Sequence, residues 1–255
     1  MSIKQINKNY IIYTLGISFV FLLWLIFAST LGSGNLYFPT PMATFAKLGE
    51  LLSDSYIYAS IGWTLLRTLI GFLSAVLLAL VLGTLAGNYQ SLYTFLKPLM
   101  TVFKSLPTAA LVFVFLALSG SRFAPIYIVF LISFPILYES VVGGIKSIPS
   151  EIIDNLKIDT NGGIRPMLKV KLPIAAPYFI VGIASSFALS LKTTIMAEII
   201  TGDTGYGLGN AIRAYRALDP TDLSPVFAIS FIAIVFVLIV DIIGIIVNKK
   251  IENIK

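Results

Sequence analysis

The chain has no cysteine and no histidine, and charged residues make up only 12% of its 255 positions. Without cysteine or histidine it can form no disulfide, use no thiolate or imidazole in catalysis and build none of the common zinc sites. A soluble domain carries about 25% charged residues. Here 57% of the residues are apolar and the mean hydropathy is +0.93. The composition therefore indicates a membrane protein.

Six apolar runs have a length suited to crossing a membrane. They cover about residues 10–31, 58–87, 98–118, 123–145, 173–200 and 225–247. A helix needs roughly 20 apolar residues to cross a bilayer core about 30 Å thick. The third run is short and is interrupted near its start by Lys104 and Pro107, so a strict hydropathy criterion counts five or six. We expect one all-α transmembrane domain over residues 1–255, with six transmembrane helices and a first helix that is retained rather than cleaved.

Residues 39–53 differ from these runs. Pro39-Thr40-Pro41 is followed by apolar residues at helical spacing, with charged residues elsewhere around the helix. The apolar residues are Met42, Phe45, Leu48, Leu51 and Leu52. This pattern predicts a short amphipathic helix that lies at the membrane interface.

The basic residues indicate how the chain is oriented. If the N-terminus is cytoplasmic, the inner segments hold twelve Lys and Arg residues and the outer segments hold four, while Arg67 and Lys192 lie within the runs. An excess of basic residues on the cytoplasmic side is the rule for membrane proteins. The sequence therefore predicts that both termini are cytoplasmic. The net charge of +6 is explained by this orientation and does not indicate a nucleic acid partner.

The longest polar segment is the inner loop 146–171. Ile148-Pro149-Ser150-Glu151 has the form of a helix start with Ser150 as the N-cap. Asn161-Gly162-Gly163 then predicts a break, and a second short helix can run from Ile164 to Val170. An amphipathic helix at this surface fits the groove of a partner protein. It fits equally well a solvated loop whose lysines extend towards lipid headgroups, and the residues alone leave both interpretations open.

Five ionisable residues lie within the apolar runs: Arg67, Glu139, Lys192, Glu198 and Asp241. Such residues are costly in a membrane and usually face the interior of a helix bundle or an aqueous cavity. They either line or gate a pathway, or pair with one another and fix the packing. Lys192 and Glu198 are six residues apart and so lie on different faces of a helix. Lys192 is the best candidate for contact with an anionic solute.

The loop 146–171 resembles the EAA loop of ABC-importer permeases, whose pattern is Glu-Ala-Ala, three residues, Gly, nine residues and Ile-x-Leu-Pro. Val170-Lys171-Leu172-Pro173 matches the end of this pattern, which places Asp154-Asn155-Leu156 at Glu-Ala-Ala and Thr160 at Gly. The acid is kept as Asp, while the two alanines and the glycine are replaced, and Gly162 and Gly163 stand near the turn. The resemblance implies that an ATPase docks on Asp154, Asn155, Leu156, Thr160, Gly162, Gly163 and Arg165.

Other segments resemble, in order along the chain, the permeases of the sulfonate, taurine and nitrate type. They are Tyr37–Pro41, Arg67–Phe72 with Gly83 and Gly87, Pro98-Leu99, Lys104–Ala110, Ser133–Ile136, Ala197-Glu198, Gly205–Gly209 and Asp241. The ordered set covers roughly residues 37–247. It implies the type I ABC-importer permease fold, with six transmembrane helices and an interfacial helix.

The resemblance also implies partners and a location. Such a permease pairs with a second permease subunit, identical or a sister chain, in a prokaryotic cell membrane. Two cytoplasmic ATP-binding subunits supply ATP hydrolysis, and an extracytoplasmic substrate-binding protein delivers the solute. This chain has no Gly-Lys dipeptide and hence no P-loop, so ATP and Mg²⁺ would be held by the partner ATPase and no cofactor by this chain. The resemblance implies a sulfonate, nitrate or vitamin-precursor-like solute.

The glycine-rich outer segment Thr201–Asn210 has no nucleotide fingerprint between a strand and a helix. It predicts a compact re-entrant turn or an external gate. The charged residues that follow it, Arg213, Arg216, Asp219 and Asp222, could face a binding protein or simply face solvent.

Two other classes of function fit the sequence less well. An ion-coupled secondary transporter would use the membrane charges for coupling, but such carriers often show internal repeats with broken helices, and none is visible in this sequence. A membrane enzyme would lack histidine, cysteine and any clustered pair of acids. The sequence therefore favours a transport subunit that is not itself an enzyme.

Overall fold

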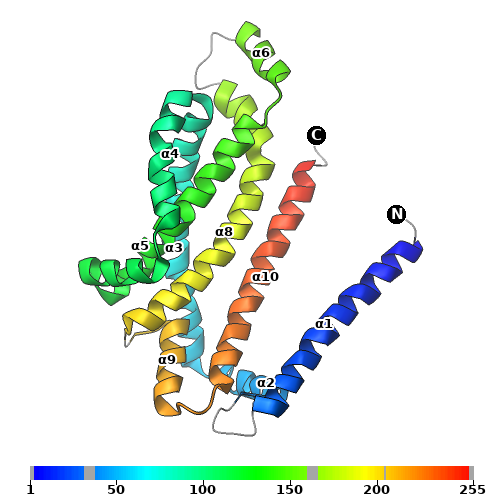
Figure 1. Cartoon of the computed structure of the whole chain (residues 1–255), viewed down its shortest axis with the longest axis vertical. Helices are drawn as coiled ribbons and strands as arrows, with labels where there is room; N and C mark the ends of the chain where they lie inside the picture. Colours follow the sequence, from blue (N-terminus) through cyan, green and yellow to red (C-terminus); the bar gives the residue numbers. More distant parts are fainter. Residues whose placement is uncertain (1–2, 32–37, 160–165, 204, 253–255) are drawn as a thin grey trace. The chain divides into compact units, whose positions relative to one another are not determined.

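The computed structural model describes residues 3–31, 38–159, 166–203 and 205–252. Within these ranges the chain is helical and contains no strand, which confirms the all-α prediction (Figure 1). The elements are α1 (Ile3–Leu31), α2 (Pro41–Leu51), α3 (Ser55–Asn88), α4 (Gln90–Ser105), α5 (Thr108–Lys146), α6 (Ser150–Asp159), the π-helical turn η1 (Met167–Lys171), α8 (Leu172–Thr201), α9 (Leu208–Leu218) and α10 (Ser224–Glu252).

Five helical segments in the described ranges are long and apolar enough to cross a membrane. They are Ile11–Thr30, Ser55–Asn88, Thr108–Lys146, Met167–Thr201 and Ser224–Ile246. The predicted count of six is therefore not confirmed. With 16 residues, α4 is shorter than the roughly 20 that a span requires.

The predicted span over 98–118 is not one helix, because a break divides it at Leu106-Pro107, where the sequence already indicates an interruption. α4 ends at Ser105, Leu106 is extended (φ −68°, ψ 128°) and α5 begins after Pro107. The residue before a proline is sterically driven out of the helical region, which explains this break. Within α5, Gly120 has φ 76° and ψ 171°, which side chains rarely allow, and it separates the stretch that begins at Thr108 from the longer stretch that ends at Lys146.

The chain divides into two compact units. The first comprises residues 1–58 and 211–232, and the second comprises 59–210 and 233–255. In the first unit, α2 begins as predicted for a short helix over 39–53: the Thr40 hydroxyl accepts a hydrogen bond from the Ala43 amide at 3.2 Å, and Pro41 occupies the first turn. The location of α2 at the membrane interface stays a prediction.

Aromatic residues form much of the packing in the first unit. The Trp24 indole N–H donates to the Pro39 carbonyl at 2.9 Å, and the Trp24 ring lies 5.9 Å from that of Phe227. Phe227 also meets Phe38 edge-on at 5.2 Å. Phe45 of α2 meets Phe231 of α10 in the same geometry at 5.4 Å. These contacts join α1, α2 and the start of α10 around one aromatic cluster.

In the second unit, α3, α4, α5 and α8 surround one hydrophobic core. Glycines let α3 approach α5 closely: a Cβ atom at Gly83 would lie 2.8 Å from the Cβ of Val141, and one at Gly87 would lie 2.9 Å from Ile145. Small residues have this role wherever membrane helices pack backbone to backbone.

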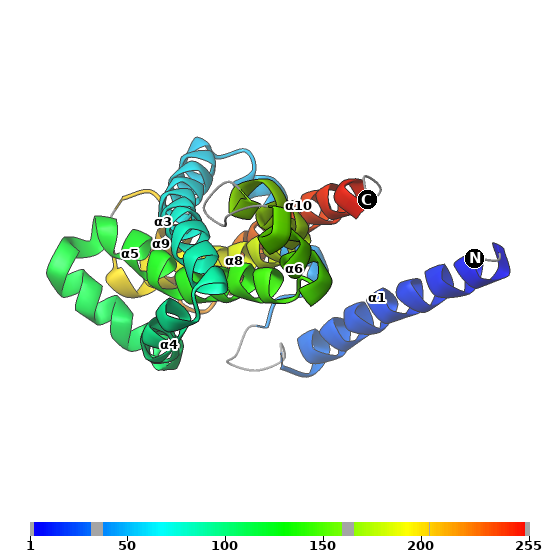
Figure 2. The same cartoon turned by 90° about the horizontal axis from the view of Figure 1, so that it is seen from above.

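The helices α5 and α8 lie side by side (Figures 1 and 2). A Cβ at Gly144 would lie 2.9 Å from the Ala175 carbonyl oxygen, and one at Gly182 would lie 2.6 Å from the Ser140 Cβ. Between these points and the far end of α8, the buried hydroxyls of Ser133 and Ser190 are hydrogen-bonded at 2.6 Å. The two helices are therefore held together at several levels.

Candidate functional site

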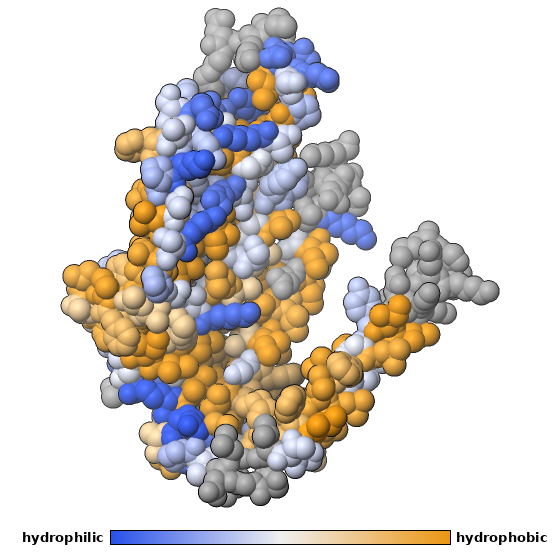
Figure 3. All heavy atoms as spheres, viewed as in Figure 1, coloured by the Kyte–Doolittle hydropathy of each residue, from blue (hydrophilic) through white to orange (hydrophobic). Residues whose placement is uncertain are grey.

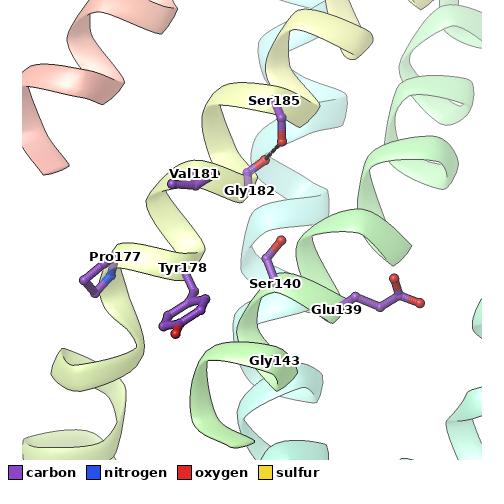
Figure 4. Close-up of a pocket in the computed structure, with 8 residues that line it drawn as sticks. All are labelled: Glu139, Ser140, Gly143, Pro177, Tyr178, Val181, Gly182 and Ser185. Atoms are coloured by element: carbon purple, nitrogen blue, oxygen red, sulfur yellow. Dashed lines mark hydrogen bonds between the residues drawn. The ribbon is translucent and has the colours of Figure 1, made fainter. Parts of the chain in front are cut away.

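A cavity of about 550 Å³ opens between α5 and α8. Figure 4 shows its lining, which consists of Glu139, Ser140, Gly143, Pro177, Tyr178, Val181, Gly182 and Ser185. The Glu139 side chain points away from Tyr178 in this view. It forms an ion pair with Lys104 in the last turn of α4, and both side chains are about half exposed (51% and 42%). The cavity therefore combines hydroxyl groups and an aromatic ring with one carboxylate that already has a partner.

One face of α8 is exposed along most of the helix. Its exposed residues from the cavity onwards are Tyr178, Val181, Ser185, Leu189, Lys192 and Ile199, and spacings of three, four and seven residues place them on a single face. We call these six residues the α8 stripe. No described residue forms a hydrogen bond or an ion pair with Lys192. The α8 stripe is thus a mostly apolar surface that carries one free ammonium group.

One exposed face of α4 is polar, while Phe95, Leu99 and Val102 are exposed on a neighbouring face. Thr94, Lys97, Thr101 and Lys104 recur at the spacing of one helix face and are exposed. Figure 3 shows hydrophilic side chains gathered over α4, beside an apolar surface. Within a membrane, polar and charged residues usually face an aqueous cavity or a partner rather than lipid.

Arg67 of α3 and Glu198 of α8 form a buried ion pair. The Arg67 Nη1 donates to the Glu198 Oε1 at 2.8 Å, and the two residues are 5% and 1% exposed. The Thr64 hydroxyl, three residues before Arg67, lies 2.9 Å from the Glu198 Oε2, and the Gly209 amide donates to the same oxygen at 3.0 Å. Three groups thus compensate for the loss of water around this carboxylate.

The glycine-rich segment closes over Glu198. Gly202 ends α8 in the left-handed conformation (φ 68°). The Arg67 Nη1 donates to the Tyr206 carbonyl at 2.8 Å, and the Thr64 hydroxyl accepts from the Leu208 amide at 2.8 Å. A Cβ at Gly207, whose φ is 155°, would lie 2.7 Å from the Glu198 carboxyl carbon. We call Thr64, Arg67 and Glu198 the carboxylate clamp, because together they hold this segment against α3 and α8.

Comparison with known proteins decides the family. Residues 75–253 match the family described as "Binding-protein-dependent transport system inner membrane component". The chain belongs to this family. It is therefore the permease component of an ABC importer and an inner-membrane protein, which confirms the resemblance stated from the sequence.

Individual relatives agree with this assignment. The permease is 27% identical over 204 residues to the nitrate import permease protein NrtB of Leptolyngbya laminosa, covering 79% of this chain and 71% of that protein. It is 24% identical to the putative aliphatic sulfonates transport permease protein SsuC of Bacillus subtilis, covering 66% and 62%. A solved inward-facing structure of the MetNI methionine ABC transporter has the same fold, with a TM-score of 0.63, 16% identity and coverage of 76% and 93%.

The docking residues that the sequence predicts lie on and after α6. Asp154 and Asn155 are exposed on this helix and Leu156 is half-buried. Thr160, Gly162, Gly163 and Arg165 lie outside the described residues. The helix begins at Ser150, and the Pro149 carbonyl accepts hydrogen bonds from the Ile152 and Ile153 amides, so it starts one residue earlier than an N-cap at Ser150 requires.

The second helix expected in this loop is continuous with the membrane helix. From Met167 the chain runs through η1 into α8 without a break, so Met167–Thr201 forms one helical rod of 35 residues. The Lys171 Nζ donates to the Asn88 Oδ1 at the end of α3 at 2.5 Å. The rod is thus anchored to α3 at this end and through the carboxylate clamp at the other.

The charged residues that the sequence predicts to line or gate a pathway fall into three situations. Arg67 and Glu198 are buried partners in the clamp, Glu139 is an exposed partner of Lys104, and Lys192 is exposed on the α8 stripe. The side chain of Asp241 lies outside the described part of the chain. Their roles as pathway or gate residues stay predictions.

The charged residues after α9 take part in local turns. The Asp219 carboxylate accepts hydrogen bonds from the Thr221 hydroxyl and amide and from the Asp222 amide, and these bonds lower the pKa of Asp219 below its usual value. Asp222 accepts from the Ser224 amide at 2.8 Å, at the start of α10. These hydrogen bonds within the turn are enough to explain why aspartate occupies positions 219 and 222.

Sequence reasoning missed two parts of this site. Thr64 belongs to the clamp, and its position three residues before Arg67 was a usable signal, since such residues share a helix face. The spacing of Tyr178, Ser185 and Lys192 by sevens likewise marks the α8 stripe. The contact of Lys104 with Glu139 joins residues 35 positions apart, and no local pattern predicts it.

Proposed function

We propose that this permease forms the solute pathway of the importer and is driven by a separate cytoplasmic ATPase that docks on the segment 146–171. The observation that carries the proposal is the place of α6 in a chain of this family. α6 lies between the end of α5 at Lys146 and the start of the rod at Met167. α6 is therefore linked along the chain to both helices that border the 550 Å³ cavity, and we propose that a force applied to α6 is passed to them.

The packing of α5 and α8 supports transmission of that force. Contacts at Gly144, Gly182 and the Ser133–Ser190 pair hold the two helices together at several levels. Close-packed helices move as bodies rather than deforming continuously. A rod of 35 residues is about 50 Å long at 1.5 Å per residue. Movement at the docking segment would therefore reach the glycine-rich segment through α8 and the carboxylate clamp.

The surface of the α8 stripe and α4 favours an anionic solute. The free ammonium of Lys192 and the exposed lysines of α4 are positive, and the Glu139 carboxylate is paired with Lys104. The names of the relatives mention nitrate and aliphatic sulfonates, and a further relative is the bicarbonate transport permease CmpB of Synechococcus elongatus. A small singly charged oxyanion is the solute class that fits both observations.

Further partners and the orientation follow from the proposal. We propose a complex of two permease subunits, two ATP-binding subunits that hold ATP and Mg²⁺, and an extracytoplasmic substrate-binding protein. Both termini would be cytoplasmic, in keeping with the basic residues of the inner segments.

Co-purification tests the proposal. A tagged full-length permease, isolated in mild detergent from cells that express its neighbouring genes, should bring down an ATP-binding subunit in about equal amounts. Deletion of α6 with its flanking loop should abolish this recovery while the permease itself stays in the membrane. If the lone chain instead drives gradient-coupled uptake in vesicles, the proposal fails and the secondary-transporter interpretation replaces it.

Replacement of Lys192 by alanine tests the solute pathway. We expect uptake of the anion to fall about tenfold, because an ammonium on the stripe attracts the anion into a region of low dielectric constant. ATPase recovery should not change, since Lys192 is exposed and no described residue pairs with it. Uptake is measured with radiolabelled solute in proteoliposomes.

Two variants control for this experiment. Lys192→Arg keeps the charge and should retain most of the uptake, and Leu189→Ala alters the same stripe without a change of charge. Unchanged uptake kinetics in Lys192→Ala would exclude a role for this ammonium in the pathway.

A further inference from the structure

A second, smaller cavity of about 300 Å³ lies beside the carboxylate clamp. Its lining residues are Trp63, Arg67, Arg122, Asp203, Gly205 and Tyr206. It is separate from the α5–α8 cavity, with which it shares no residue. It lies at the end of α8 where the glycine-rich segment begins, whereas η1 and α6 lie at the start of α8.

Two guanidinium groups meet one indole ring in this cavity. The Cζ of Arg122 lies 5.5 Å from the centre of the Trp63 ring, and the Cζ of Arg67 lies 5.6 Å from it. Arg122 follows the break at Gly120 and also lies 5.9 Å from the Phe123 ring. A guanidinium over the face of an aromatic ring is attracted to the ring, and its N–H groups can still donate in the plane of the guanidinium.

The two arginines differ in what they already bind. The Arg67 Nη1 is committed to Glu198 and to the Tyr206 carbonyl, and its Nη2 lies 3.7 Å from the Asp203 carboxylate. Arg122 is exposed, and no described residue forms an ion pair or a hydrogen bond with it. The Arg67 guanidinium therefore stabilises the clamp, whereas the Arg122 guanidinium lies over an aromatic ring and is available to bind a ligand.

We propose that Arg122, held on Trp63, binds a small singly charged oxyanion such as a sulfonate or a carboxylate in this cavity. A guanidinium matches the two oxygens of such a group with two parallel hydrogen bonds. The formal charges of Arg67, Arg122, Glu198 and Asp203 sum to zero, so one added negative charge is tolerated better than two. The cavity thus discriminates against divalent anions such as sulfate. This inference rests on the proposed function only in that the anion would be the solute in transit.

Tryptophan fluorescence provides a direct test, because the chain has two tryptophans, Trp24 and Trp63. In the full-length Trp24→Phe permease, Trp63 is the only reporter. Sodium methanesulfonate replaces sodium chloride at constant ionic strength, and we expect a saturable change of fluorescence. Arg122→Gln should weaken the apparent affinity about tenfold or more, since it removes a charge-assisted pair of hydrogen bonds. Arg122→Lys keeps the charge, so its apparent affinity for methanesulfonate should lie between that of the Trp24→Phe permease and that of its Arg122→Gln variant. Sulfate should bind more weakly than methanesulfonate.

The opposite results overturn the inference. These are a change that is linear in methanesulfonate, an affinity that is equal in Arg122→Gln, or sulfate binding as tightly as methanesulfonate. If Trp24→Phe is unstable, the thermal unfolding midpoint of the unaltered chain replaces fluorescence, because an anion that binds the folded state raises it. An ATPase that co-purifies while Trp63 reports no saturable binding would refute this site and leave the proposed function intact.

Discussion

Replacement of Glu198 by alanine is expected to destabilise the permease by about 3–5 kcal/mol, because it leaves a buried arginine without its partner. The Arg67 side chain is 6% exposed, and after the substitution the nearest acid is Asp203 at 3.7 Å. The Thr64 hydroxyl and the Gly209 amide also lose their acceptor. The thermal unfolding midpoint of the purified permease should fall by roughly 10 °C. We expect the amount of folded protein in the membrane to fall with it.

The matched control is Glu139→Ala, which removes a carboxylate of the same type from an ion pair with Lys104. Both partners of that pair are about half exposed, so the loss should be at most about 1 kcal/mol. Equal shifts of the unfolding midpoint in the two variants would show that burial of the Arg67–Glu198 pair does not determine its contribution to the stability of the permease.

Charge reversal at Asp154 is expected to remove most of the bound ATPase. Asp154 is exposed on α6 and occupies the acidic position of the docking pattern. A reversed charge within a protein interface costs several kcal/mol, so the ATP-binding subunit recovered with Asp154→Arg should fall at least about tenfold. Quantitative immunoblotting of the affinity-purified complex measures this recovery.

Glu50→Arg is the control for this substitution, since it makes the same charge change on α2. Glu50 is exposed and forms an ion pair with Lys47 at 2.7 Å, three residues away, a type of contact that contributes little to stability. The recovery of ATPase should be unchanged in this variant. Full recovery in Asp154→Arg as well would remove α6 from the docking surface.

Local chemistry made several helices predictable. The apolar spacing after Pro39-Thr40-Pro41 predicted α2, which begins at Pro41. The break at Leu106-Pro107 lies where Lys104 and Pro107 interrupt the third predicted span, and the break at Gly120 lies between the third and fourth predicted spans. A proline within an apolar run and a glycine beside polar residues are the local signals of these two breaks.

The clamp shows what the sequence could not provide. Arg67 and Glu198 were recognisable separately as costly charges in apolar runs, but they are 131 positions apart. Their contact depends on how α3 and α8 pack, and the sequence around each residue does not predict which residue it pairs with. The same packing explains why Gly207 and Gly209 stand close to Glu198: a Cβ at Gly209 would lie 2.6 Å from the Glu198 Cβ.

Uptake by the reconstituted complex tests the central claim most directly. The permease, its co-purified ATPase and the binding protein are assembled in proteoliposomes with ATP on the side that carries the ATPase. Labelled solute is then added with the binding protein on the other side. The account predicts uptake that requires ATP and the binding protein and that is lost in Asp154→Arg. Uptake driven by an ion gradient without ATP, and unaffected by Asp154→Arg, would contradict it.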